Sequence, residues 1–325
     1  MQSGDGPVSP QIPGIHHVTA IAGDPQQNLD FYTGLLGLRL VKRTVNFDDP
    51  YTYHLYYGDQ LGRPGGILTF FPWPGAPRGR RGAGQLTATS FSVPAPALGY
   101  WMERLKSHGV AFEGPTRRFE EEVLTFGDRD GLQLELVAGS EADPRGPWKE
   151  GPVPADQAIR GFYGVTVSEE GYEQTAALLT ATLGFRRARE AGNRFRYEAG
   201  SGGPGAVVDV LCLPAAPPGR VGVGTVHHVA WRASNDEEQK YWRGRIADLG
   251  FNVTPVLDRN YFRSIYFREP GGVLFEIATD PPGFTADEPP EQLGTRLKLP
   301  PWLEPHRAEI EQRLPPLHLP ATGTH

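Results

Sequence analysis

The residues best suited to chemistry in this 325-residue chain gather in two short segments that both contain the letters HHV, at 16–18 and 227–229. Each segment belongs to an alternating run of the kind that predicts a half-buried strand. Side chains alternate between the two faces of a strand, so the apolar residues share one face, and His17 and His228 take corresponding places on the other. The two segments therefore predict two matched histidines on the polar faces of two strands.

A carboxylate joins these histidines in the segment GVLFEIA, where Glu276 lies between two apolar residues. A buried carboxylate is unfavourable unless it is paired or bound to a cation. Two histidines and one carboxylate are the ligand set typical of non-haem Fe(II), and the same ligands also hold Mn, Ni or Zn. His17, His228 and Glu276 are therefore a candidate metal site, and the residues alone leave the identity of the metal open.

The strands that must position these residues belong to an internal repeat. The segment 87–136 matches the segment 225–277, because Trp101 corresponds to Trp242 and Glu135 to Glu276 at the same separation along the chain. The segments 14–20 and 161–167 match less closely. The chain is therefore predicted to contain four modules, at residues 12–75, 85–139, 158–214 and 222–280.

Each module has the pattern expected of a β-α-β-β-β unit. It opens with a strand, continues with a short amphipathic helix that ends at a glycine suited to a left-handed cap, and closes with three strands. The letters PGG between SIYFRE and GVLFEIA predict a hairpin. We therefore expect an α+β fold with an N-terminal domain at 12–139, a linker at 140–157 that is rich in Pro, Gly and charge, and a C-terminal domain at 158–280.

The last segment, 281–325, is predicted to be a Pro-rich tail with one short helix. In WLEPHRAEIEQRL (302–314), Leu303, Ile310 and Leu314 fall on one helical face, which must pack on the body of the protein. Two interpretations are open. The tail covers an exposed sheet edge, or it caps the mouth of the active site and limits the entry of water.

Composition restricts the class of protein. The chain has 32 basic and 38 acidic residues, a formal net charge of -6, which disfavours a nucleic-acid-binding protein. The single cysteine, Cys212, excludes an intrachain disulfide framework and a cysteine-rich zinc site. We see no secretory signal and no apolar run near the roughly 20 residues of a membrane helix. We expect a cytoplasmic protein that acts on a small molecule, and a homo-oligomer is compatible with the sequence.

The repeated module with its HHV openings and FE closing resembles the vicinal oxygen chelate superfamily, which includes glyoxalase I, extradiol ring-cleaving dioxygenases and antibiotic-resistance binding proteins. The segment IPGIHHVTAIAGDPQQNLDFYTGLLGLRLVKRTVNFDDPYTYHLYYGD, with GTVHHVAW and LDRNYFRSIYFREPGGVLFEIATD, is similar to the ring-cleaving dioxygenases that act on hydroquinones and chlorohydroquinones. The resemblance covers about residues 12–315. It implies two half-barrel clefts, each made by two modules.

The resemblance also implies a cofactor and a set of site residues. The metal is expected to be Fe(II), with Mn(II) or another divalent ion as alternatives, held by His17, His228 and Glu276. Further roles in the pocket are implied for the residues that match the motifs HHVT, HHVA and DRNYFRSIYF, namely His16, Thr19, His227, Arg259 and Tyr266. Strict alternation turns His16 and His227 away from the cleft, so a twist or bulge at the start of each strand is required.

The resemblance further predicts how the modules combine. A cleft of this superfamily takes one histidine from the first strand of each of its two modules and the glutamate from the last strand of the second. Only modules 1 and 4 together supply the full triad. We therefore expect module 1 to lie beside module 4 around one metal. Modules 2 and 3 then form a metal-free counterpart, in which Ser90 and Gly164 replace the histidines and Glu135 is structural.

The expected function is that of an Fe(II)-dependent dioxygenase that inserts O₂ into a hydroquinone-type, para-diol ring. In this interpretation Tyr266 donates a hydrogen bond, Arg259 stabilises anionic charge, His227 acts as acid or base, and Thr19 offers its hydroxyl.

Three alternatives remain open. The first is a catechol-type extradiol dioxygenase, whose substrate chelates the metal through two hydroxyls. The second is a glyoxalase-like isomerase, which normally needs two metal-bound carboxylates. Aligning GGILTFF with GGVLFEI places Phe70 at the position of Glu276, so the second carboxylate is missing. The third is a metal-free binding protein, for which an intact triad is unnecessary.

Overall fold

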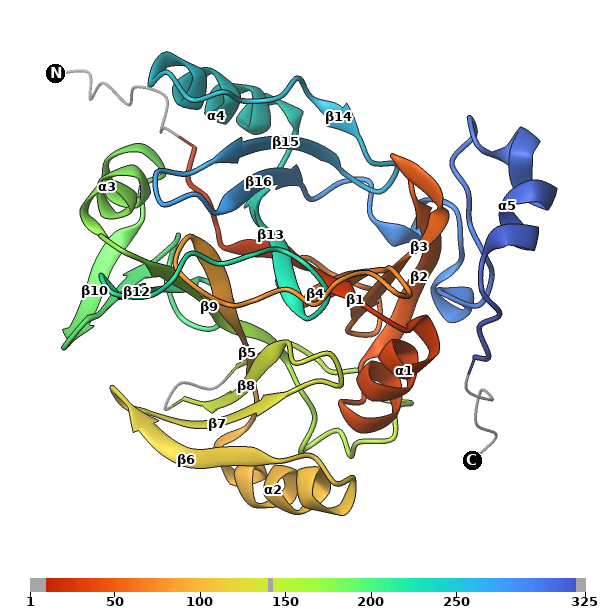
Figure 1. The fold of residues 1–325 in the computed structure, drawn as a ribbon, viewed down its shortest axis with the longest axis horizontal. Coiled ribbons are helices and arrows are strands. Elements are labelled where there is room, and N and C mark those ends of the chain that lie inside the picture. Colours follow the sequence, from red (N-terminus) through yellow and green to blue (C-terminus); the bar gives the residue numbers. More distant parts are fainter. Residues whose placement is uncertain (1–9, 140–142, 320–325) are drawn as a thin grey trace, which may run out of the picture.

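The computed structural model describes residues 10–139 and 143–319, and in them two curled half-barrel sheets of eight strands each lie side by side (Figure 1). Sheet I contains, in spatial order, β14 (Leu257–Asp258), β15 (Arg263–Arg268), β16 (Leu274–Thr279), β13 (Thr225–Ala233), β1 (Ile15–Ala22), β4 (Ile67–Pro72), β3 (Asp49–Gly58) and β2 (Arg39–Asn46). Sheet II contains β10 (Arg186–Ala191), β11 (Arg194–Glu198), β12 (Val207–Cys212), β9 (Gly161–Glu169), β5 (Gln85–Ser92), β8 (Gln133–Ala138), β7 (Glu121–Gly127) and β6 (Phe112–Arg118).

Every module has the predicted β-α-β-β-β order. The helices that follow the four opening strands are α1 (Pro25–Leu29) with a π-helical turn at Asp30–Leu35, α2 (Leu98–Ser107) after a 3-10 turn at Ala95–Ala97, α3 (Glu173–Ala177) with a π-helical turn at Leu178–Thr182, and α4 (Asp236–Asp248). The glycines predicted to end them, at positions 37, 109, 184 and 250, all have positive φ. None of the helices in the described ranges has the length and hydrophobicity needed to cross a bilayer.

Helix α4 illustrates how the sequence forms these elements. Asn235 caps it, because its side-chain oxygen accepts a hydrogen bond of 3.0 Å from the backbone N–H of Glu238. Acidic residues occupy the first turn, where they interact favourably with the helix dipole. Gln239, Trp242 and Ile246 follow one another at helical spacing and are buried. The helix therefore packs on the sheet through one narrow face.

The two sheets combine the modules as predicted. In sheet I, β1 of module 1 pairs antiparallel with β13 of module 4, and in sheet II, β5 of module 2 pairs antiparallel with β9 of module 3. The predicted pairing of module 1 with module 4 is thereby confirmed. Each sheet takes one module from each half of the chain, so the halves 12–139 and 158–280 do not correspond to the sheets one to one. The division into two domains stays a prediction.

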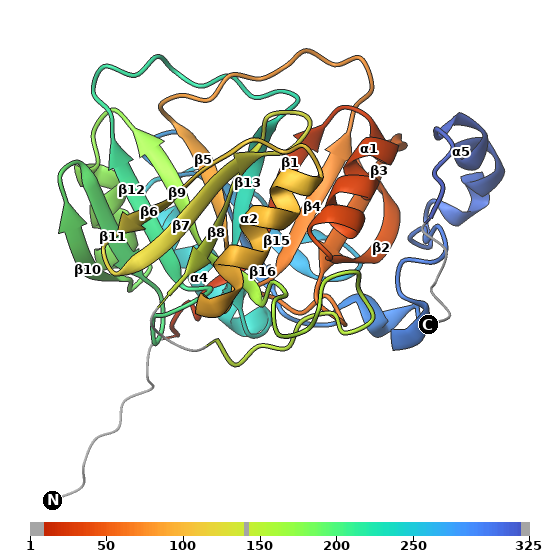
Figure 2. The same cartoon turned by 90° about the horizontal axis from the view of Figure 1, so that it is seen from below.

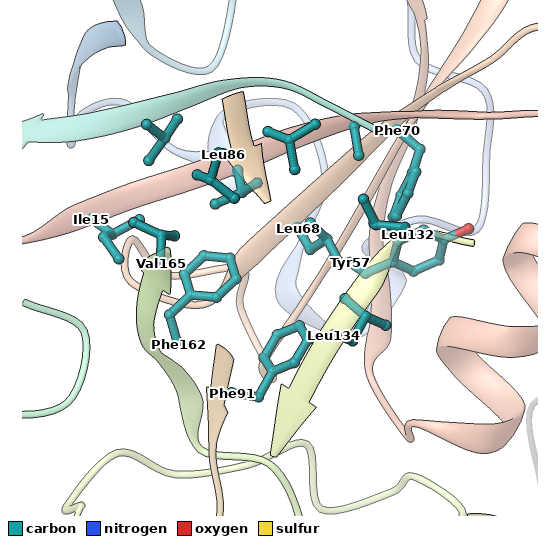
Figure 3. Close-up of a cluster of buried hydrophobic side chains, with 14 of the residues drawn as sticks. Ile15, Tyr57, Leu68, Phe70, Leu86, Phe91, Leu132, Leu134, Phe162 and Val165 are labelled. Atoms are coloured by element: carbon teal, nitrogen blue, oxygen red, sulfur yellow. The ribbon is translucent and has the colours of Figure 1, made fainter. Parts of the chain in front are cut away.

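The main hydrophobic core lies where the two sheets meet (Figure 3). Leu68 and Phe70 from β4 enter it from sheet I, while Phe91 from β5 and Phe162 from β9 enter it from sheet II, and all four are completely buried. The rings of Phe91 and Phe162 stack with centroids 5.4 Å apart. This packing leaves the opposite, concave face of each sheet for polar side chains.

Two long connections also hold the sheets together. The segment after β4 and the segment after β12 run side by side over one end of the molecule (Figure 2). Isolated bridges join Arg78 to Val223, Arg80 to Arg220 and Ala83 to Pro218. The modules are therefore coupled both through the core and through this ribbon.

The described part of the tail, residues 281–319, lies along the edge of sheet I formed by β2. It contains 3-10 turns at Phe284–Ala286, Pro290–Gln292 and Glu304–His306, and α5 (Arg307–Arg313). Arg43 of β2 forms a bridge with Leu297, and its carbonyl accepts a hydrogen bond of 2.9 Å from the N–H of Lys298. The predicted short helix is confirmed, and Ile310 and Leu314 are buried. The tail therefore covers this sheet edge, as the first interpretation expects.

Candidate metal centre

Three strands of sheet I bring the predicted triad together. His17 lies on β1, His228 on β13 and Glu276 on β16, and β13 pairs with both of the other strands. Glu276 Oε2 lies 3.2 Å from His17 Nε2 and 2.9 Å from His228 Nε2, and the two nitrogens are 3.3 Å apart. All three residues are buried, and within the described ranges they are the one group of at least three His, Cys, Asp or Glu residues spaced to hold a metal ion.

The spacing of these three atoms fits a divalent metal. Protein nitrogen and oxygen ligands bind such ions at about 2.0–2.2 Å, so two ligands at right angles lie about 3 Å apart and two tetrahedral ligands about 3.4 Å apart. The observed values of 2.9, 3.2 and 3.3 Å extend from the first arrangement towards the second, so the spacing is compatible with either. Three ligands at right angles occupy one triangular face of an octahedron and leave three positions for other molecules.

The required strand bulges are present at His16 and His227. The register between β1 and β13 shifts between Ile15 and His17, and again opposite residues 226–228, so each preceding histidine is the extra residue of a bulge. His16 Nδ1 lies 2.9 Å from His17 Nδ1, and His227 Nδ1 lies 2.8 Å from His228 Nδ1. Each preceding histidine thus orients its neighbour so that the Nε2 atom of that neighbour points to the triad.

Electrostatics favour the metal-binding forms of these residues. Burial lowers the pKa of His228, which keeps the imidazole neutral. Burial alone would raise the pKa of Glu276, but His17 and His228 hold it well below its usual range. Ser264 Oγ donates a hydrogen bond to Glu276 Oε1, which leaves Oε2 directed at the histidines. A neutral imidazole and an ionised carboxylate are the forms that bind metal.

The triad opens on a cavity of about 330 Å³ inside sheet I. Its walls come from β1, β3, β4, β13, β15 and β16, from the β2–β3 turn and from the segment before β15. Among the predicted pocket residues, His227, Arg259 and Tyr266 line it. His16 does not: it is buried with its ring edge against Phe262, 5.1 Å between centroids.

Tyr266 and Arg259 form the wall beside Glu276. Tyr266 lies directly opposite Glu276 in the pairing of β15 with β16, as predicted from the hairpin. Its ring meets the ring of His228 edge-on at 5.6 Å, and the Arg259 guanidinium lies 5.6 Å from its centroid. Burial and the nearby Glu276 raise the pKa of Tyr266, so its phenol stays a proton donor. Arg259 also forms an ion pair of 3.1 Å with Asp48 across the cavity.

Thr19 does not line the cavity, because it is buried and its hydroxyl contacts that of Thr69. Its Oγ1 lies 2.8 Å from Thr69 Oγ1, and Thr69 Oγ1 in turn lies 2.9 Å from His54 Nε2. His54 Nδ1 is 2.9 Å from the Tyr56 hydroxyl. The four side chains form a row of hydrogen-bonded groups across β1, β4 and β3.

The strand pairing at Thr69 corrects one detail of the sequence alignment, namely which residue of module 1 corresponds to Glu276. Thr69 of β4 pairs with Thr19 of β1. In module 4, Glu276 of β16 pairs with Ala230 of β13, the residue that corresponds to Thr19. Thr69, and not Phe70, therefore occupies the position that corresponds to Glu276. Phe70 points into the hydrophobic core. The alignment was wrong by one residue because the turn before β4 and the turn before β16 differ in length. The absence of a second carboxylate still holds, because threonine carries none.

His54 is a cavity residue that the sequence did not single out. It lines the cavity between Tyr56 and Phe71, with ring centroids 4.0 and 4.3 Å away. Burial lowers its pKa well below the usual range. The signal was its place in the alternating run TYHLYY, in which every second side chain faces the cavity.

In the corresponding cleft of sheet II, the positive charge beside the buried glutamate comes from the side chain of Arg118. Arg118 donates two hydrogen bonds, 2.7 and 2.6 Å, to the two oxygens of Glu135, and Ser90 donates a third of 2.6 Å. Ser90 lies opposite Glu135, just as Ala230 lies opposite Glu276, so Ser90 corresponds to Ala230. Two residues earlier on each strand, Ala88 corresponds to His228. The position of the missing histidine is therefore taken by Ala88 and not by Ser90. With its carboxylate fully paired, Glu135 has a structural role, as expected.

Comparison with known proteins identifies relatives along most of the chain. Residues 14–136 and 165–277 match the model of the Glyoxalase/Bleomycin resistance protein/Dioxygenase superfamily. The "Putative ring-cleaving dioxygenase MhqO" of Bacillus subtilis is 51% identical over 306 residues, which cover 94% of this chain and 97% of that protein. The "Chlorohydroquinone/hydroquinone 1,2-dioxygenase" of Sphingobium indicum is 36% identical, with 92% and 95% covered.

Solved structures show the same arrangement. The crystal structure of a "putative dioxygenase" from Bacillus subtilis superposes with a TM-score of 0.91 at 49% identity and covers 96% of this chain and 99% of its own. Glyoxalase I from Zea mays superposes with a TM-score of 0.62 at 14% identity, covering 82% of this chain and 92% of its own. The second likeness shows the fold alone.

Proposed function

Because the chain belongs to the Glyoxalase/Bleomycin resistance protein/Dioxygenase superfamily, with ring-cleaving dioxygenases among its relatives, we propose that it is an Fe(II)-dependent dioxygenase that opens a hydroquinone-type ring. The observation that carries this proposal is the convergence of His17 Nε2, His228 Nε2 and Glu276 Oε2 at one side of a cavity. Three ligands on one face of an octahedral ion leave room for a substrate oxygen and O₂.

The protein would contribute binding, orientation and charge. Fe(II) held by His17, His228 and Glu276 would supply a site where a phenolate oxygen and O₂ meet and exchange electron density. Tyr266 would donate a hydrogen bond to a substrate oxygen from the wall beside Glu276, because burial raises its pKa and its phenol remains protonated. Arg259 places a permanent positive charge near any anionic oxygen in the cavity.

His227 would act at the cavity edge. If the Nδ1–H of His228 donates to His227 Nδ1, the proton of neutral His227 sits on Nε2. Burial lowers the pKa of His227 to about 3, so the neutral ring is the resting form. In this tautomer the Nε2–H of His227 faces the cavity as a donor, so His227 would hold an anionic substrate oxygen by a hydrogen bond and would not act as its base.

We favour a para-diol because of the substrate named for one relative, and the size of the cavity is compatible with a single ring. A cavity of about 330 Å³ lined by Tyr56, Phe71 and Phe262 suits a single aromatic ring. The relative from Sphingobium indicum, matched over 92% of this chain, is named for hydroquinone and chlorohydroquinone. A para-diol binds a metal through one oxygen only, so its second hydroxyl must be held by other side chains that line the cavity, and His54 is one of these.

The other candidate functions fit the site less well. A glyoxalase-type isomerase normally has a second carboxylate on the metal, but Thr69 holds that position and is hydrogen-bonded to Thr19. A metal-free binding protein would have no use for three buried ligand atoms within 3.3 Å of one another. A catechol-type enzyme would use the same triad, so the substrate test must separate it.

The test is reconstitution under argon with Fe(II), Mn(II) or Zn(II), one metal at a time, followed by oxygen uptake with hydroquinone and with catechol. The proposal predicts uptake with Fe(II), and a larger kcat/KM for hydroquinone than for catechol. A preference for catechol would replace the substrate class. Equal turnover with Zn(II) would exclude the redox role of the metal.

A further inference from the structure

The internal repeat places a second tyrosine beside the triad. Tyr56 on β3 pairs with Thr69 on β4. In module 4, Tyr266 on β15 pairs with Glu276 on β16. Since Thr69 occupies the position that corresponds to Glu276, Tyr56 is the counterpart of Tyr266. In the strand order of sheet I, β3 and β15 lie on opposite sides of the three strands that carry the triad, so the two tyrosines flank it.

The side chains two positions before each tyrosine support this correspondence. Ser264 precedes Tyr266 by two residues and donates a hydrogen bond to Glu276 Oε1. His54 precedes Tyr56 by two residues, and its Nε2 lies 2.9 Å from Thr69 Oγ1. In both modules a polar side chain is thus hydrogen-bonded to the residue that lies opposite the tyrosine. The repeat therefore extends to the hydrogen bonds around each tyrosine.

The row of hydrogen bonds that ends at Tyr56 has one direction in which every buried proton finds an acceptor. Thr19 and Thr69 are completely buried, and among the described residues the Thr19 hydroxyl has Thr69 as its one partner. Thr19 must therefore donate to Thr69, and the Thr69 hydroxyl must donate to its other partner, His54 Nε2. Burial keeps the pKa of His54 low, so the ring is neutral and carries its proton on Nδ1, from which it donates to the Tyr56 oxygen.

This direction leaves the proton of the Tyr56 hydroxyl for the cavity. Tyr56 lines the cavity, and within the described ranges His54 Nδ1 is the one hydrogen-bond partner of its hydroxyl. Burial and the nearby Tyr266 and Glu276 raise the pKa of Tyr56, so its phenol stays protonated. Both ring nitrogens of His54 have partners in the row, so His54 acts on the cavity through Tyr56.

We propose that Tyr56 is a second phenol that donates a hydrogen bond to the anionic substrate oxygen at the triad, an inference that rests on the proposed function. Thr19, Thr69 and His54 are positioning residues, because they fix the direction in which the Tyr56 hydroxyl donates. Tyr266 would approach the oxygen from the side of Glu276, and Tyr56 from the side of Thr69. A second carboxylate in place of Thr69 would repel an anionic oxygen, whereas the row of hydroxyls supplies a donor to it.

The experiment measures binding and not turnover. The full chain is loaded with Zn(II) and titrated with 4-nitrophenol, which has a single hydroxyl, ionises readily and reports its phenolate form by absorbance. Tyr56→Phe should keep its zinc, measured by metal analysis, and bind the phenolate roughly tenfold or more weakly, because one hydrogen bond to a charged group is lost.

Tyr57→Phe is the matched control. Tyr57 is the next residue on the same strand, and its buried hydroxyl donates a hydrogen bond of 2.9 Å to Asn28 Oδ1. Since Tyr57 does not line the cavity, this variant should bind the phenolate as wild type does.

Two variants of Thr69 test the positioning row. Thr69→Val removes the donor to His54 Nε2, which allows His54 to accept from Tyr56 instead, so phenolate binding should weaken. Thr69→Ser keeps the hydroxyl and should bind with wild-type affinity. The inference is overturned if zinc-loaded wild type binds no phenolate, if Tyr56→Phe or Thr69→Val binds it as wild type does, or if Tyr57→Phe loses as much affinity as Tyr56→Phe.

Failure of this inference can be told apart from failure of the proposed function. If Tyr56→Phe weakens phenolate binding but Fe(II)-loaded wild type consumes no O₂ with hydroquinone, the proposed function fails and the donor role of Tyr56 stands. If wild type consumes O₂ and opens the ring while Tyr56→Phe binds the phenolate normally, only the role of Tyr56 is refuted.

Discussion

Replacing Tyr266 by phenylalanine isolates one hydrogen bond at the proposed active site. The ring is held by edge-on contact with His228 at 5.6 Å and by the Arg259 guanidinium at 5.6 Å from its centroid, and phenylalanine keeps both contacts. Only the hydroxyl is lost, so the free energy of unfolding should change by about 1 kcal/mol or less. Loss of one donor to a charge that develops in the transition state costs about 2.7–4 kcal/mol, which is roughly 100- to 1000-fold in kcat.

The assay is oxygen uptake with hydroquinone by Fe(II)-loaded protein, together with iron content and Tm for each variant. Tyr266→Phe should bind iron as wild type does and lose most of its kcat. Tyr163→Phe is the matched control, because Tyr163 is a buried tyrosine of sheet II whose hydroxyl donates to Glu121 at 2.7 Å. It should leave turnover unchanged. Wild-type turnover in Tyr266→Phe would refute the donor role, and loss of iron would show that Tyr266 supports the ligands instead.

The remaining predictions test the ligands, the tail and one buried carboxyl. His17→Ala, His228→Ala and Glu276→Ala should each abolish iron binding, measured by metal analysis, while Glu135→Gln keeps it because Arg118 and Ser90 bind Glu135 in the other sheet. Truncation after Pro281 should make the protein insoluble, because it exposes the edge of β2 and removes Asp287 and Glu288, the ion-pair partners of the fully buried Lys42. A soluble product that binds iron would contradict this prediction. Burial raises the pKa of Asp128 to about 6, so its contribution to stability is complete below pH about 4 and is lost as the pH rises through 6. Denaturant unfolding should therefore show that the free energy of unfolding of Asp128→Asn rises by about 2–3 kcal/mol relative to that of wild type between those pH values. A difference between the two proteins that does not change with pH would contradict the raised pKa of Asp128.

The sequence predicted the elements and the triad because the internal repeat gives each position an independent comparison. A single HHV string is weak evidence, but two at corresponding places, with Glu276 in a matched strand, indicate shared geometry. The pairing of modules 1 and 4 followed from the same comparison, and β1 and β13 are indeed neighbours. The bulges at His16 and His227 were required by alternation and are present, although His16 does not reach the cavity.

What the sequence could not predict depends on contacts between strands that are distant in the repeat. The pairing of β3 with β4 brings His54 and Thr69 into contact. Neither residue has an equivalent of the same type in the other modules, so the internal repeat does not identify them. The one-residue error at Phe70 arose because a turn length cannot be read from an alignment of strands.

The most direct test of the central claim is the stoichiometry of a single turnover. Fe(II)-loaded protein is mixed with one equivalent of hydroquinone and with O₂, and the O₂ consumed, the ring-opened product and hydrogen peroxide are measured together. The proposed function predicts one O₂ consumed for each ring opened, with no peroxide. Consumption of O₂ with formation of peroxide and benzoquinone, or no consumption at all, would contradict it.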